Sequence, residues 1–193
     1  MELVLSKDHL NSIDFSRYKK YDLDIGNEYF YLEAGKEHYR LLAHLSTLMN
    51  NRVFLDVGTN HGCSALALGY NPQNRIHTVD IVNNRKEKFK KEGNITFHLG
   101  DANEMLTGVR PSIAFLDADK SDDFEKSLIK NLIPIMAGSG YLIMDDYHEY
   151  PVVQECITDL IGKGFKVYDL TEYGHYSGTH LVDLYGDLRV KCI

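Results

Sequence analysis

The sequence predicts an α/β fold with a mostly parallel seven-stranded sheet, helices on both of its faces and a last antiparallel strand. Three observations support this fold class. Short apolar runs alternate with amphipathic segments along most of the chain, and five of these runs are followed by an aspartate at a turn. No linker, repeat or low-complexity segment interrupts the 193 residues. We therefore expect a single domain over residues 1–193.

The expected elements follow a polar, tyrosine-rich lead-in at residues 1–32, to which no structure is assigned. Apolar residues at helical spacing predict a first helix at 33–49. Further helices are expected at 62–69, 84–92, 102–107, 122–136 and 151–162. Strands are expected at 52–55, 75–81, 95–99, 113–116, 141–144, 165–168 and 180–185. Because no helix precedes the last strand, it should pair antiparallel with its neighbour.

The composition is that of a globular protein, with a formal net charge of −7. A negatively charged surface repels a phosphate backbone, so we expect no nucleic-acid partner. The basic run at 85–91 is interpreted as the solvated face of a helix. Three widely separated cysteines (Cys63, Cys156 and Cys192) show no disulfide or zinc spacing and favour a reducing compartment. The first residues lack a signal-peptide core and no run is long enough to span a membrane, so we expect a soluble, cytoplasmic protein without a membrane partner.

The segment 54–64 carries the strongest functional signal. A strand ends in an aspartate, a turn with two glycines follows, and a helix of small residues begins. The residues concerned are Asp56, Gly58, Asn60, Gly62 and Ser64. Glycines let backbone approach a ligand closely, and a helix start offers N–H groups to an anion. The spacing resembles the first motif of class I S-adenosylmethionine-dependent methyltransferases, which implies S-adenosylmethionine as the cofactor.

Further cofactor contacts are expected at the same edge of the sheet, because ligands of open α/β sheets bind beyond the carboxyl ends of the strands. Asp56 would face the amino group of the methionine moiety, and Ser64 its carboxylate. Asp80 would accept hydrogen bonds from the ribose hydroxyls. Asp101 would accept from the adenine amino group, while Ala102 leaves room for the ring. The alternative for Asp80 and Asp101 is that each caps a following helix.

A second set of acids follows the fourth and fifth predicted strands. Asp117 ends one strand, and Asp145 and Asp146 end the next. If these strands are neighbours, their tips lie about 5 Å apart, and three carboxylates that close repel one another unless a cation neutralises them. Oxygen ligands suit magnesium or a similar divalent ion. The sequence therefore predicts a metal site at these three acids, with local capping roles as the alternative.

The two acid-bearing segments extend the resemblance to metal-dependent O-methyltransferases. Leu116-Asp117-Ala118-Asp119-Lys120 resembles the aspartate-plus-lysine segment of catechol and caffeoyl-CoA O-methyltransferases, whereas the Asp145-Asp146 pair resembles the macrocin-type sugar O-methyltransferases. The first likeness implies Lys120 as the catalytic base, the second Asp119. Both imply a Rossmann-like sheet, and Asp117 is assigned to the cofactor as well as to the metal. The likeness covers residues 35–185.

The expected function is transfer of a methyl group from S-adenosylmethionine to a hydroxyl of a small molecule, a phenol, catechol or sugar diol, with help from Mg²⁺ or a similar divalent cation. Loops 147–150 and 172–176 should lie on the same edge and contact the acceptor. The alternatives are a metal-independent methyltransferase and a non-catalytic adenosylmethionine-binding module. An oxidoreductase is disfavoured, because Asn60 stands where a dinucleotide site requires glycine. A homodimer is one expectation for the assembly.

Overall fold

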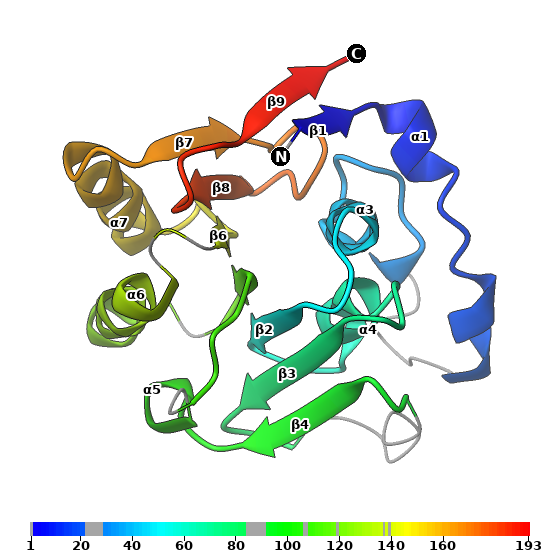
Figure 1. The fold of residues 1–193 in the computed structure, drawn as a ribbon, viewed down its shortest axis with the longest axis horizontal. Coiled ribbons are helices and arrows are strands. Elements are labelled where there is room, and N and C mark those ends of the chain that lie inside the picture. Colours follow the sequence, from blue (N-terminus) through cyan, green and yellow to red (C-terminus); the bar gives the residue numbers. More distant parts are fainter. Residues whose placement is uncertain are drawn as a thin grey trace.

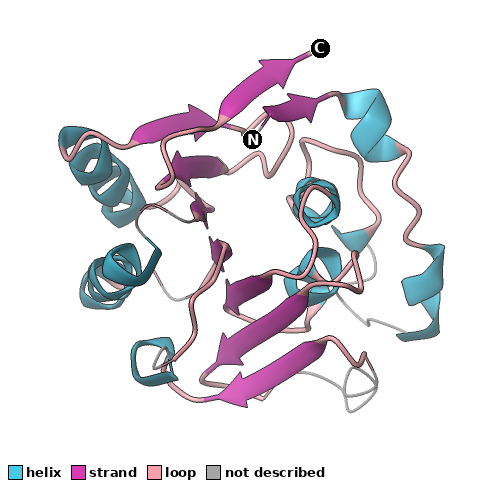
Figure 2. Ribbon diagram, viewed as in Figure 1, coloured by secondary structure: helices cyan, strands magenta, loops and turns pink. Residues whose placement is uncertain are grey.

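A computed structural model of the chain describes residues 2–21, 29–83, 92–105, 108–118, 120–136, 138 and 140–193. It contains a seven-stranded sheet with helices on both faces, as the sequence predicts (Figures 1 and 2). The predicted helix at 84–92 lies almost entirely outside the described residues, as do residues 106 and 107 of the helix predicted at 102–107. Within the described ranges, no helix is long and apolar enough to cross a membrane.

The seven strands are arranged in the order β4-β3-β2-β5-β6-β8-β7. They are β2 (Val53–Val57), β3 (Arg75–Asp80), β4 (Ile95–Leu99), β5 (Ile113–Leu116), β6 (Tyr141–Met144), β7 (Lys166–Asp169) and β8 (His180–Asp183). The five strands from β4 to β6 pair in parallel, whereas β8 pairs antiparallel with both β6 and β7. This confirms the antiparallel last strand of the predicted sheet. It also confirms that β5 and β6 are neighbours, which the predicted metal site requires.

Two helical layers cover the sheet, α3 (Tyr39–Thr47) and α4 (Cys63–Leu68) on one face and α5 (Ala102–Met105), α6 (Asp122–Met136) and α7 (Pro151–Gly162) on the other (Figure 1). Side chains alternate between the two faces along each strand. Phe54 of β2 therefore packs in the cluster under α3 and α4, and Leu55 packs under α6 and α7. The central strands β2, β5, β6 and β8 are thus buried on both sides, which leaves their ends as the open surface.

The structure adds elements that the sequence did not predict in the lead-in. Strand β1 (Glu2–Leu5) pairs in parallel with β9 (Arg189–Cys192) as a separate two-stranded sheet. Helix α1 (Lys7–Asn11) and the 3-10 helix η1 (Ser16–Tyr21) follow β1. The helix predicted at 33–49 begins only at Tyr39, because the chain turns at Gly35, whose φ is +86°.

The lead-in packs against α3 and α4 and fixes the start of α3. Tyr18 is buried and donates a hydrogen bond to the carbonyl of Leu66, 2.9 Å away. The Arg40 guanidinium donates to main-chain carbonyls of two separate parts of the lead-in, including Leu32 at 2.7 Å and Ile13 at 3.0 Å. Hydrogen bonds from a charged donor are stronger than neutral ones. Arg40 therefore anchors the segment just before α3, which carries Glu37 and His38.

Candidate active site

The turn after β2 has the tight geometry that its glycines predict. The backbone N–H groups of Gly58 and Thr59 donate to the carbonyl of Val79, at 2.9 and 3.3 Å. Gly58 has a φ of +96°, and a Cβ atom added there would lie 1.9 Å from the carbonyl oxygen of Asp117. Only glycine fits a backbone contact this close. Gly62 has a φ of +91° and closes the turn immediately before α4.

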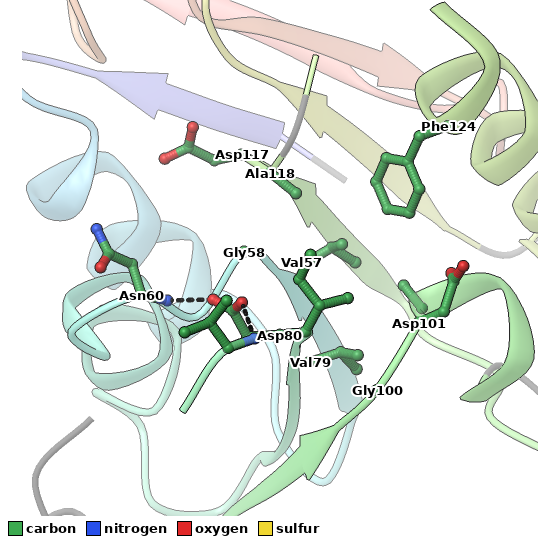
Figure 3. Close-up of a pocket in the computed structure, with 13 residues that line it drawn as sticks. Val57, Gly58, Asn60, Val79, Asp80, Gly100, Asp101, Asp117, Ala118 and Phe124 are labelled. Atoms are coloured by element: carbon green, nitrogen blue, oxygen red, sulfur yellow. Dashed lines mark hydrogen bonds between the residues drawn. The ribbon is translucent and has the colours of Figure 1, made fainter. Parts of the chain in front are cut away.

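Asp80 connects this turn to the end of β3. One of its carboxylate oxygens accepts from the N–H of Asn60 at 2.7 Å, and the other accepts from the N–H of Val82 at 2.9 Å (Figure 3). Each carboxylate oxygen has two lone pairs, so both can accept a further hydrogen bond from a ligand. The helix that Asp80 would cap in the alternative interpretation lies outside the described residues.

A cavity of about 400 Å³ opens between these strand ends (Figure 3). Its walls include six of the predicted site residues: Gly58, Asn60, Asp80, Asp101, Ala102 and Asp117. Phe124 of α6 closes one side with an aromatic ring. Asp101 also accepts from the N–H of Asn103 at 2.8 Å and so supports the start of α5, as its capping alternative predicts. The two roles are compatible, because the same residue lines the cavity.

A second, more polar hollow of about 280 Å³ adjoins the first. Gly58, Asn60 and Asp117 line both hollows, and the second one adds Ser64, Tyr39 and Cys63. Ser64 thus lies where the sequence places a cofactor contact, at the start of α4. The two hollows therefore meet at the strand ends, where Asp117 lines both of them.

Asp56 lies beneath the turn, and one of its carboxylate oxygens has no hydrogen-bond partner among the described residues. Its side chain is fully buried, and it lines neither hollow. It accepts a hydrogen bond from Thr78 at 2.6 Å, and Thr78 in turn is bonded to Thr59 of the turn. Burial raises the pKa of Asp56 to about 7, although hydrogen bonds from Thr78 and Ser64 oppose the shift. Asp56 therefore supports the glycine turn from beneath, and its contact with the methionine moiety stays a prediction.

Asp145, at the end of β6, forms the centre of a buried charge cluster. One of its carboxylate oxygens lies 3.0 Å from Nδ1 of His38 and 3.0 Å from Nδ1 of His175. The other accepts from the Thr179 hydroxyl at 2.8 Å. Burial alone would raise the pKa of Asp145, but the two histidines hold it below its usual range. The same partnership raises the pKa of His38 to about 9, against its own burial.

The other predicted metal ligands lie at the rim of this cluster. The Asp117 carboxylate lies 4.0 Å from Nε2 of His38 and is one third exposed. Asp146 accepts from the Ser177 hydroxyl at 2.7 Å and lies 3.7 Å from Nδ1 of His175. Burial and the nearby charge of Asp145 raise the pKa of Asp117, which His38 partly offsets. The structure thus links the acids in two neighbouring groups, Asp117 and Asp145 with His38, and Asp145 and Asp146 with His175.

Of the two candidate bases, the structure describes Lys120 and not Asp119. Lys120 is buried, with its ammonium 3.5 Å from the carbonyl of Leu116 and 4.0 Å from Asp117. A salt bridge to Asp117 is the alternative to a role of this lysine as the catalytic base. Asp119 lies outside the described residues.

Sequence reasoning missed Glu37, His38 and His175. Glu37 lies 3.8 Å from His38 and 3.7 Å from His175, so it joins the cluster of histidines and acids. His175 belongs to the loop between β7 and β8, which was expected at this edge for its aromatic residues. His38 has no signal of its own, because its contacts with Phe115 of β5 and with Asp145 after β6 appear only in three dimensions.

Comparison with known proteins supports the fold. No protein-family model matches the chain, and no curated protein matches it significantly. Among solved structures, one from Klebsiella pneumoniae, provisionally assigned as an O-methyltransferase, has 15% identity and a TM-score of 0.63 over 91% of this chain and 97% of its own. The SAH-bound methyltransferase PaMTH1 from Podospora anserina has 16% identity and a TM-score of 0.60, with 75% and 76% covered.

A third structure is MycE, a methyltransferase from the mycinamycin biosynthetic pathway, in complex with Mg and SAH. It has 18% identity and a TM-score of 0.54, and the match covers 69% of this chain and 45% of MycE. Identities in this range establish the fold and not the reaction. The chain therefore has the Rossmann-like fold of class I methyltransferases.

Proposed function

We propose that this chain is an S-adenosylmethionine-dependent methyltransferase that methylates a hydroxyl group of a small molecule. The observation that carries the proposal is the cavity at the strand ends. It combines a glycine turn, a carboxylate at the end of β3 and a short wall of Asp101, Ala102 and Phe124. The carboxylate of Asp80 can accept hydrogen bonds from the two vicinal hydroxyls of the cofactor's ribose, and the flat adenine ring fits beside Ala102 and Phe124.

Methyl transfer would then occur near Asp117, where the two hollows meet. The acceptor oxygen attacks the methyl carbon in line with the carbon–sulfur bond, so that a C–O bond forms while the S–C bond breaks. The proton of the hydroxyl passes to a base, for which Lys120 and Asp119 remain the two candidates. Holding the two reactants in line supplies much of the rate enhancement in such a displacement.

A divalent cation is part of the proposal, and the residues present fit one. Asp117, Asp145 and Asp146 are joined by two histidines, and among the described residues the buried Nε2 of His38 has no hydrogen-bond partner. This is a mixed nitrogen and oxygen donor set, whereas the sequence predicted oxygen alone. Residues of this cluster would hold the ion, either as ligands or, like Asp145, by orienting a histidine, and the bound ion would acidify and orient the acceptor hydroxyl.

Two measurements test this function. Isothermal titration calorimetry should show stoichiometric binding of S-adenosylmethionine to the chelator-treated protein. A screen of catechols and sugar diols, with and without added divalent ions, should then show methyl transfer that depends on the ion. Without S-adenosylmethionine binding the whole proposal fails. Binding combined with full activity under chelation removes only the metal, and binding without turnover of any hydroxyl acceptor favours a non-catalytic module.

A further inference from the structure

His38 is held in a fixed orientation at the entrance to α3. Its side chain is 3% exposed, and Nδ1 lies 3.0 Å from the carboxylate of Asp145. The aromatic ring of Phe115 packs against the imidazole, with ring centroids 4.7 Å apart. Because a carboxylate accepts a hydrogen bond, Nδ1 carries the proton and Nε2 is left as the free ring nitrogen whenever the imidazole is neutral.

That second nitrogen is buried and lacks a hydrogen-bond partner among the described residues. It points toward the carboxylate of Asp117, whose nearer oxygen is 4.0 Å away. A buried polar atom without a hydrogen bond costs about 1–3 kcal/mol, which makes this nitrogen a candidate ligand atom. Nε2 itself is shielded from solvent, whereas Asp117 is one third exposed, so an ion between the two side chains would remain accessible from the side of Asp117.

Asp145 resembles the carboxylates that support metal-binding histidines. Such a carboxylate accepts from one ring nitrogen and thereby directs the other nitrogen at the ion. His38, Asp117 and Asp145 each place a donor atom within 4.8 Å of the other two. Two ligands bound at about 2.0–2.2 Å lie at most about 4.4 Å apart. The 4.0 Å between Nε2 of His38 and the carboxylate of Asp117 already lies within this limit.

We propose that Nε2 of His38 and the carboxylate of Asp117 are ligands of a divalent transition-series cation such as Mn²⁺, Co²⁺ or Zn²⁺, with Asp145 positioning the imidazole. The inference deepens the proposed function, because it names the ion class of the same site. A mixed imidazole and carboxylate set suits Zn²⁺ and Co²⁺, and Mn²⁺, the weakest binder of the series, can still occupy it, whereas Mg²⁺ requires oxygen ligands. The site should therefore prefer them to Mg²⁺, contrary to the expectation from the sequence.

The test is spectroscopic and needs no turnover. The full chain, without an affinity tag and cleared of metal by chelation, is titrated with Mn²⁺ alone and measured by pulsed electron paramagnetic resonance. The expected result is one bound ion per chain with coupling to a ¹⁴N nucleus, and no displacement by a hundredfold excess of Mg²⁺. Absence of ¹⁴N coupling in the wild-type protein, or ready displacement by Mg²⁺, overturns the proposal.

Variants identify which histidine nitrogen produces the ¹⁴N coupling. His38→Gln should lose the ¹⁴N coupling and weaken Mn²⁺ binding by about 10–100-fold. His148→Gln, at an exposed histidine after β6, is the matched control and should keep both. Coupling that survives in His38→Gln contradicts the assignment. If His38→Gln does not fold by circular dichroism, Asp117→Asn takes its place and should weaken Mn²⁺ binding while retaining the coupling; unchanged affinity counts against the site.

These outcomes are separable from those of the proposed function. Binding of S-adenosylmethionine to the metal-free protein is measured by calorimetry on the same preparation. Cofactor binding with no ¹⁴N coupling leaves the methyltransferase proposal standing and refutes the histidine ligand. A bound Mn²⁺ ion with ¹⁴N coupling but no cofactor binding supports the histidine ligand and refutes the methyltransferase proposal.

Discussion

Replacing Asp56 by asparagine tests the buried carboxyl beneath the glycine turn. Asparagine has nearly the same shape and keeps an oxygen that accepts from Thr78, but it cannot ionise. In the wild-type protein the pKa of Asp56 rises from 3.8 to about 7, because burial disfavours the charged form. The substitution therefore removes a charge that the folded protein accommodates poorly.

The sign and size of the effect follow from proton linkage. Between pH 3.8 and about 7 the folded state binds more protons at Asp56 than the unfolded state does, so the free energy of unfolding falls as pH rises. Well above pH 7 the ionisation of Asp56 lowers the free energy of unfolding by about 4 kcal/mol in total. Roughly 2–3 kcal/mol of this loss develops between pH 5 and pH 8. For a chain of this length that loss corresponds to about 5–10 °C in melting temperature.

Thermal unfolding followed by circular dichroism, in chelator at pH 5 and pH 8, measures this difference. The wild-type protein should lose stability relative to Asp56→Asn as the pH rises. The comparison between the two proteins isolates Asp56, because the shifted histidines are common to both. Parallel pH dependence in the two proteins would refute the buried, proton-binding carboxyl.

Two further predictions concern the cofactor cavity. Gly58→Ala should abolish S-adenosylmethionine binding in calorimetry, because the new Cβ would meet the backbone of Asp117. Gly164→Ala, which has a similar φ of +89° and no atom within 4 Å of the added Cβ, should cost only the backbone strain of about 1–2 kcal/mol and leave binding intact. Asp80→Ala should weaken S-adenosylmethionine binding by about 10–100-fold, because the turn loses its support and the ligand loses an acceptor. Asp169→Ala removes an exposed aspartate of similar local geometry and should have no effect. Equal affinities in Asp80→Ala and Asp169→Ala would exclude Asp80 from the cofactor site.

The strand ends could be predicted because they depend on local signals. Apolar runs of four to six residues mark the strands, and the parallel sheet then brings their carboxyl ends to one edge. Asp80, Asp101 and Asp117 consequently reach a common cavity. The full burial of Asp56 was not predicted, because strand alternation directs its side chain into the layer beneath α4, a detail that the motif alone does not specify.

The histidines could not be predicted in the same way. His38 and Asp145 are 107 residues apart, and their contact depends on how the lead-in and Arg40 set the entrance to α3. The predicted repulsion among the three acids was a sound electrostatic expectation, but it left open which positive groups would balance them. In the structure two imidazoles do so at Asp145.

The pairing of β1 with β9 has a consequence for how the molecule folds. Its register joins Glu2 to Arg189 and Leu5 to Cys192, so the pair closes a loop that contains almost the whole chain. Loops of this length carry a large closure entropy, and contacts between distant residues form late. We expect the amides of β1 and β9 to gain protection in pulse-labelling hydrogen exchange after those of β2, β3 and β5. Their protection would then report that the rest of the sheet has already assembled.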